Sequence, residues 1–200
     1  LDLFEEEEQV SAEQIHVQTD PVERAIAAIE QVLLRGLCPI IAYSSGKDSA
    51  NVALLTFNAA IKVKQAIGWC PKIYLVNADT RVESPVVRAI AETEIARMRA
   101  FAAAHGLDFE PWVVAPSLAR AFASRIIGGR ALPSFPAVNS SCSIEWKVNS
   151  STRAIREIKK KENGRTVLFI GTRSGESAKR AVSTAERKET AHTTWFGPDG

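Results

Sequence analysis

Long apolar runs are absent from this chain of 200 residues. The apolar stretches at residues 52–55 and 167–170 are far shorter than the ~18 residues that a membrane-spanning helix needs. The sequence does not open with a basic segment followed by an apolar one, which is the pattern of a secretory signal. We therefore expect a soluble, cytoplasmic protein.

Cysteine, glycine and proline are scarce. The three cysteines, Cys38, Cys70 and Cys142, form no CxxC pair and have no histidine at ligand spacing, which argues against a disulfide framework and a structural zinc site. With 46% hydrophobic residues, 24% charged residues, 11 glycines and 9 prolines, the composition excludes disordered and collagen-like chains. The sequence predicts an ordinary globular domain.

Positive and negative charges are nearly balanced, and the formal net charge is only +2. The whole molecule therefore has no strong general attraction to nucleic acid or to an anionic membrane. Four consecutive glutamates at residues 5–8 predict a solvated acidic arm over residues 1–19. We expect one domain over residues 20–180 and a C-terminal tail over residues 181–200. The chain starts at Leu1 and stops without a closing element, which is compatible with a piece of a longer polypeptide.

Helical and strand patterns alternate along the chain. Asp20 and Pro21 are typical of a helix start, and Gly36 marks its end. The predicted elements, in order, are a helix over 21–36, a strand over 39–43, a helix over 47–66, a strand over 72–77, a helix over 84–104, a strand over 109–114, short helices and loop over 116–139, a helix over 144–160 and a strand over 166–170. This alternation predicts an open α/β fold with a mostly parallel, twisted sheet and helices on both faces.

Polar clusters follow three of the predicted strands, at residues 44–49, 77–83 and 171–180. Ligands of open α/β sheets bind outside the carboxyl ends of the strands. The three clusters are therefore candidates for a common site.

The cluster Ser44-Ser45-Gly46-Lys47-Asp48-Ser49 lies between a strand and a helix. Small residues and backbone N–H groups at a helix N-terminus favour an anion, best a phosphate. A Walker A loop is excluded, because Ile41 and Asp48 stand where glycine and Ser or Thr are required. The GxGxxG fingerprint fails for lack of glycines. Taken alone, the cluster is as consistent with a serine that caps the helix.

Three segments together resemble one superfamily. Residues 44–49 resemble the SGGxDS loop, with Ser45 in place of the first glycine. Asn77-Ala78-Asp79-Thr80, followed by Glu83-Ser84-Pro85, resembles a "DT…E(T/S)P" segment, and residues 171–177 with Arg180 resemble "GxRxxES…R". These motifs are those of the PP-loop ATP pyrophosphatases, in the branch that includes phosphoadenylylsulfate reductase. The resemblance implies an adenine nucleotide alpha-hydrolase-like fold.

Within that superfamily, the sequence is most similar to the DNA phosphorothioation proteins of the DndC and SspD type. The likeness covers residues 36–180 and includes NADTRVESPVV, the segment 127–130, Pro133, Pro136 and the stretch from Cys142 to Lys147. Members of that family carry cysteines proposed to hold an iron–sulfur cluster. This chain has no such group of cysteines, so a cluster is not expected here.

The resemblance implies a set of site residues for ATP and Mg²⁺. The residues expected to surround the pyrophosphate are Ser44, Ser45, Gly46, Lys47 and Ser49, with Arg173, Arg180, Gly171 and Lys147 approaching from other loops. Asp48 is expected to hold Mg²⁺ or to cap the helix. Asp79 and Thr80 are expected to contact metal or ribose, although a strand-end Asp equally stabilises a turn. Cys142 is either an acceptor of activated sulfur or an inert thiol.

The implied function is cleavage of ATP to AMP and pyrophosphate, which activates a DNA backbone phosphate for sulfur insertion. The implied partners are DNA, a cysteine desulfurase and other phosphorothioation proteins. Two alternatives stay open: a phosphoadenylylsulfate reductase or sulfate adenylyltransferase subunit, and a non-catalytic ATP-sensing subunit. A basic stripe at Arg153, Arg156 and residues 159–161 either meets phosphates or is a solvated helix face.

Overall fold

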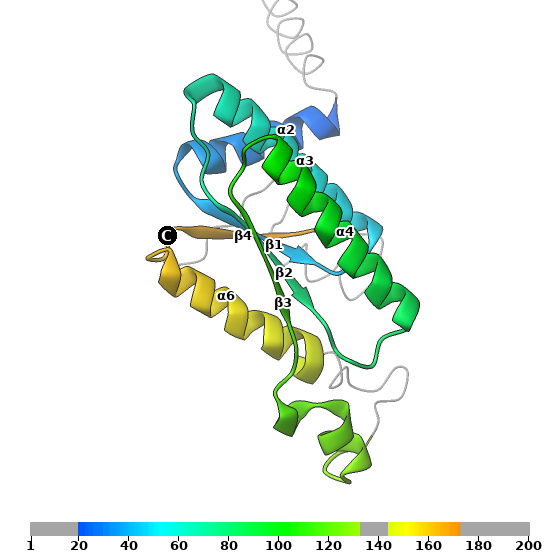
Figure 1. Cartoon of the computed structure of the whole chain (residues 1–200). Helices are drawn as coiled ribbons and strands as arrows, with labels where there is room; N and C mark the ends of the chain where they lie inside the picture. Colours follow the sequence, from blue (N-terminus) through cyan, green and yellow to red (C-terminus); the bar gives the residue numbers. More distant parts are fainter. Residues whose placement is uncertain (1–19, 133–143, 173–200) are drawn as a thin grey trace, which may run out of the picture.

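The predicted α/β architecture is confirmed in a computed structural model, which describes residues 20–132 and 144–172 (Figure 1). The elements are α2 (Pro21–Leu34), β1 (Cys38–Tyr43), α3 (Lys47–Ile67), β2 (Ile73–Ala78), α4 (Pro85–Ala104), β3 (Phe109–Val114), the short helices η1 (Leu118–Arg120), η2 (Ala123–Ile127) and η3 (Ile144–Val148), α6 (Asn149–Lys161) and β4 (Thr166–Ile170). Among these helices, none combines the length and the apolar composition needed to cross a bilayer.

The sheet has four parallel strands in the order β3-β2-β1-β4. β1 is central and pairs with β2 through Ile41 and Leu75 and with β4 through Ile40 and Leu168. The chain moves outward from β1 to β2 and β3, then returns to the other side of β1 with β4. The carboxyl ends of β1 and β4 therefore form the topological switch point, where ligands of such sheets bind.

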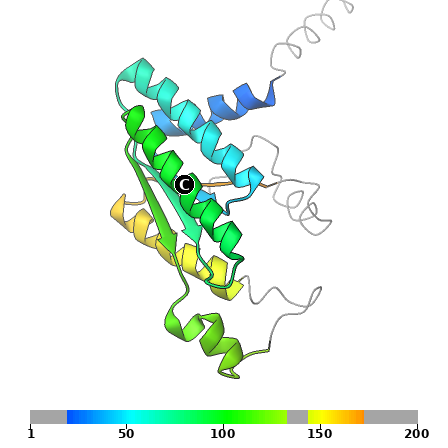
Figure 2. The same ribbon diagram turned by 45° about the vertical axis from the view of Figure 1, so that its right-hand side comes forward.

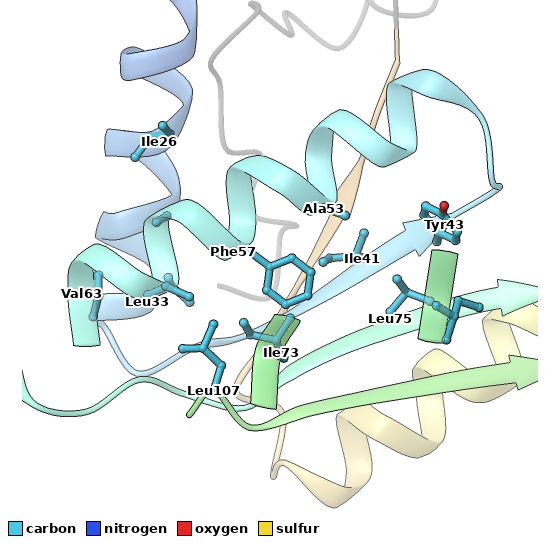
Figure 3. Close-up of a cluster of buried hydrophobic side chains, with 14 residues drawn as sticks. Ile26, Leu33, Ile41, Tyr43, Ala53, Phe57, Val63, Ile73, Leu75 and Leu107 are labelled. Atoms are coloured by element: carbon cyan, nitrogen blue, oxygen red, sulfur yellow. The ribbon is translucent and has the colours of Figure 1, made fainter. Parts of the chain in front are cut away.

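One face of the sheet is covered by α2, α3 and α4. Ile41 of β1, Ile73 and Leu75 of β2, and Phe57 of α3 belong to the same buried cluster (Figure 3). Phe57 makes an edge contact with Phe109, at 5.2 Å between ring centroids. This cluster holds α3 on the sheet and thereby places the first turn of α3 at the carboxyl end of β1.

The other face is covered by α6 (Figures 1 and 2). The alternate residues of the central strands, Ile40 in β1 and Tyr74 and Val76 in β2, pack there against Ala154 and Ile158 of α6. Both faces of β1 and β2 are thus buried, which explains why these strands are nearly continuous apolar runs in the sequence.

The expected helix start at Asp20 is confirmed. The Asp20 carboxylate accepts a hydrogen bond from the Val22 N–H at 2.9 Å, and Pro21 occupies the first helical position. The short helices expected after residue 116 are present as η1 and η2. Trp146 of η3 packs against them: its indole N–H donates to the Arg120 carbonyl at 2.8 Å, and its ring lies edge-on to Phe122.

Two carboxylates at the amino ends of the strands accept hydrogen bonds from several neighbouring side chains. The Glu110 carboxylate of β3 accepts hydrogen bonds from Lys161 (2.9 Å), Lys72 (3.2 Å) and the Trp112 indole (2.9 Å). The Lys161 ammonium, above all, lowers the Glu110 pKa from its usual 4.5 to about 2. Beside this cluster the Glu162 carboxylate accepts from the Tyr74 hydroxyl and from the Cys38 thiol. These bonds join the C-terminal end of α6 to three strands.

Burial makes Cys38 an unreactive thiol. It lies among the core residues of the α6 face, and burial together with the Glu162 carboxylate raises its pKa to about 11. Because the thiolate is the nucleophile, a thiol with such a pKa stays protonated at neutral pH. Cys38 therefore acts as a core residue.

We predict that Glu110→Gln destabilises the fold by about 1 kcal/mol at pH 7, because it removes a charge that two lysines contact. The folded-state pKa of Glu110 is depressed, so its contribution is fully present above about pH 4.5 and is lost as the pH falls towards 2. Urea unfolding at pH 7 and at pH 3 measures the difference in free energy of unfolding between the wild type and Glu110→Gln. The control is Glu92→Gln, which removes an exposed pair with Arg88. A cost for Glu110→Gln that equals the control or is independent of pH contradicts the prediction.

Candidate functional site

The loop between β1 and α3 is closed by its own hydroxyl groups. The Ser49 hydroxyl donates to the Gly46 carbonyl at 2.9 Å and accepts from the Ser44 N–H at 3.2 Å. The Ser44 hydroxyl lies 3.2 Å from that of Ser49. Ser49 is buried, so this arrangement holds the loop in one shape at the carboxyl end of β1.

Ser45 adopts the left-handed backbone conformation, with φ of 63°. This region favours glycine, which is the residue that the SGGxDS loop has at this position. The serine therefore takes up a backbone conformation that glycine adopts at no steric cost. Burial and the Glu94 charge raise the pKa of Tyr43, and the Ser45 side chain opposes this shift.

The first turn of α3 begins at a residue that has no side chain to cap the helix. Gly46 is the N-cap residue, and it supplies no side-chain hydrogen bond. The expectation that a serine caps this helix is not met, since the Ser49 hydroxyl points back to a carbonyl. Lys47 is exposed at the first helical position, and Asp48 is half-buried beside it. Backbone N–H groups at a helix N-terminus suit an anion.

Gly171 brings the end of β4 against this turn. A Cβ on Gly171 would lie 2.6 Å from the Asp48 carbonyl oxygen and 3.1 Å from the Ser49 nitrogen. Only glycine allows such a close approach of two backbones. Gly171, the first residue of the third motif, therefore lies against the first motif at the switch point between β1 and β4.

The second motif is tied to the same edge by a buried amide. The Asn77 side chain donates to the carbonyl of Tyr43, the last residue of β1, at 3.0 Å. The Asp79 carboxylate accepts from the Arg81 N–H at 2.8 Å, and the Thr80 hydroxyl accepts from the Val82 N–H at 3.4 Å. Asp79 and Thr80 thus stabilise the turn after β2, which is one of the two roles expected for Asp79.

Two cations near this turn, Lys147 and Arg88, form ion pairs. Lys147, expected to approach the phosphates, pairs with Glu83 of the second motif. This pair connects η3 to the loop after β2, so Lys147 does lie near the carboxyl edge. Arg88, in the first turn of α4, lies 4.0 Å from the Asp79 carboxylate.

Three expected site residues, Cys142, Arg173 and Arg180, lie outside the described residues. Over residues 20–132 and 144–172, no group of three or more His, Cys, Asp or Glu side chains has a metal-binding arrangement. Asp48 is thus the carboxylate that the sequence offers for Mg²⁺ in the first motif. Mg²⁺ is commonly held by one or two carboxylates together with substrate phosphates and water, so a single Asp would suit this ion if phosphates were bound beside it.

Sequence reasoning gave no role to Tyr43, Asn77 or Arg88. Asn77 carried a usable signal, because it is a polar residue at the end of an otherwise apolar strand. The charge that acts on Tyr43 comes from Glu94, 51 residues further along the chain, and the partner of Arg88 is Asp79, on the other side of the turn before α4. No local pattern marks such contacts.

We predict that two substitutions at Ser45 differ in their effect on the free energy of unfolding. Ser45→Gly relieves the left-handed strain and stays within about 1 kcal/mol of wild-type stability, whereas Ser45→Val costs about 1–3 kcal/mol because a β-branched residue is poorly accommodated at positive φ. Thermal unfolding of the two variants measures this. Equal tolerance of Gly and Val contradicts the loop conformation described above.

Gly171→Ala is predicted to destabilise the protein by about 1–3 kcal/mol, because the added Cβ overlaps the backbone of Asp48. Gly46→Ala is the control, since its Cβ meets only the Ser44 hydroxyl at an ordinary 3.4 Å. Urea denaturation compares the two. If Gly171→Ala is no more harmful than Gly46→Ala, the ends of β4 and α3 do not touch.

Comparisons with known proteins add no assignment to these observations. No protein-family model matches the sequence, and no curated protein matches it. The likeness to the PP-loop ATP pyrophosphatases therefore depends on the three short motifs and on where the described parts of them lie.

Proposed function

We propose that this protein is an ATP pyrophosphatase that cleaves ATP between the α and β phosphates. The observation that carries the proposal is the contact between Gly171 and the first turn of α3. This helix begins at Gly46, an N-cap residue without a side-chain hydrogen bond, and follows a loop with Ser45 in the glycine conformation. The first motif and the first residue of the third motif, which both resemble segments of one superfamily, lie together there, and this supports the proposal.

The chain's own groups suit a pyrophosphate leaving group. As the bond between the α-phosphorus and the bridging oxygen breaks, negative charge grows on the β phosphate. The backbone N–H groups of the first turn of α3 and the Lys47 ammonium are positive groups at this end of the helix. The buried Ser49 hydroxyl fixes the loop, so these donors need no rearrangement during the reaction.

Asp48 is the residue that would hold Mg²⁺. The ion, when present with the nucleotide, would neutralise phosphate charge. Without a cation, a carboxylate at this position would repel a polyphosphate. Asp48 also lies in the first turn of α3, where the helix dipole stabilises its negative charge.

The acceptor that we propose is a DNA backbone phosphate. A non-bridging phosphate oxygen attacks the α-phosphorus of ATP, pyrophosphate leaves with the electron pair of the broken bond, and the DNA phosphate becomes linked to AMP. The terminal sulfur of a persulfide on a cysteine desulfurase partner then attacks the DNA phosphorus, and AMP leaves with the electron pair of the broken P–O bond. A second thiol reduces the resulting P–S–S bond, which leaves the phosphorothioate and a disulfide. This choice of acceptor is supported by the NADTRVESPVV and Cys142-to-Lys147 segments, which resemble phosphorothioation proteins.

We predict that the protein releases pyrophosphate and AMP from ATP in the presence of Mg²⁺ and that Lys47→Ala lowers the rate by about 10²–10³, because it removes a cation from the leaving group. Lys62→Ala is the matched control: it removes an exposed lysine of the same helix, far from the loop, and leaves the rate unchanged. A coupled assay for pyrophosphate measures the rate of release by the wild-type protein and by the two variants.

Products other than AMP and pyrophosphate refute the proposal, as does an equal loss in the two lysine variants. ATP binding by the wild-type protein without turnover, with and without duplex DNA, favours a nucleotide-sensing subunit instead.

A further inference from the structure

The outer face of α6 carries four exposed basic residues. Arg153, Arg156, Lys159 and Lys160 are all exposed, and Glu157 is the one acidic residue of the helix. Arg153, Arg156 and Lys160 recur at spacings of three and four, so they share one face. From Arg153 to Lys160 this face extends about 10 Å along the helix axis. We call these four residues the α6 basic face.

The α6 basic face differs from the basic residues of the opposite layer by its lack of ion pairs. Within the described part of the chain, none of its four members lies within ion-pair distance of a carboxylate, although Glu157 is four residues from Arg153. On the other side of the sheet, several cations are neutralised by nearby carboxylates. These pairs are Lys62 with Glu23, Arg88 with Glu92, and Arg97 with Glu94.

A polyanion complements this face better than a membrane does. A membrane-surface helix needs apolar side chains beside its basic ones. The apolar residues Ala154 and Ile158 of α6 are buried against the sheet and are not available to lipid. A row of unpaired cations without apolar neighbours matches evenly spaced phosphates, which bind such groups with release of counterions.

The direction of α6 connects this face to the candidate site. Its C-terminal end lies at the amino edge of the sheet, where Lys161 contacts Glu110 and Glu162 contacts Cys38. Its N-terminal end follows η3, whose Lys147 contacts Glu83 at the carboxyl edge. A backbone that follows the α6 basic face therefore leads from one edge of the sheet to the edge that carries the candidate site.

We propose that the α6 basic face binds the phosphate backbone of duplex DNA. The choice of DNA among nucleic acids rests on the proposed function. The match between the α6 basic face and a polyanion is independent of it. The contacts go to phosphates alone, so binding is independent of base sequence and depends strongly on salt.

The test uses the full chain without ATP and a fluorescent 20-base-pair DNA duplex, titrated between 50 and 200 mM NaCl. Arg156→Gln/Lys160→Gln weakens binding and makes the slope of log K against log [salt] shallower by about 2, one for each lost phosphate contact. The matched control is Arg24→Gln/Arg99→Gln, which removes the same charge from exposed positions of α2 and α4 and changes the slope by less than about 0.5.

Equal effects of the two double variants overturn the proposal, because they indicate a general charge effect. Binding of a duplex RNA or of anionic vesicles through the α6 basic face, without binding of DNA, also overturns it. Since DNA binding is measured without nucleotide, wild-type protein that binds DNA in this way but releases no pyrophosphate refutes the proposed function and leaves the α6 basic face in place.

Discussion

The central position of β1 is the constraint on which the rest of the structure depends. β1 pairs on both sides and is buried on both faces, so the place where it ends is fixed. The loop that follows must turn at once into α3, which the Phe57 cluster holds on one face of the sheet. Ser45 in the left-handed region and the Ser49 hydroxyl make that turn possible. Gly171 then allows β4 to end against it.

The two edges of the sheet differ in how their charged groups are paired. At the amino edge, Glu110 and Glu162 are surrounded by donors, and their bonds hold α6 to the strands. At the carboxyl edge, the N-cap residue of α3 is Gly46, which supplies no side-chain hydrogen bond, and Lys47 is exposed. The first arrangement stabilises the fold. The second is the place where we propose that the phosphates of ATP bind.

Much of the fold was predictable from local patterns. The apolar runs of β1 and β2, the Asp20-Pro21 start and the glycine after α2 specify the elements, because each reflects local backbone and burial requirements. The site was predictable only as a set of motifs. Sequence alone shows neither that Gly171 touches Asp48 nor that Asn77 binds the Tyr43 carbonyl, since these contacts depend on strand order. The pairing of Lys147 with Glu83 joins residues 64 positions apart and has no local signal.

The most direct test of the central claim is the fate of oxygen-18 when the protein turns over ATP in labelled water without a DNA acceptor. Attack at the α-phosphorus places the label in AMP and leaves pyrophosphate unlabelled, which is the result that the account predicts. Label in orthophosphate, accompanied by ADP, would show attack at the γ-phosphorus and would contradict it.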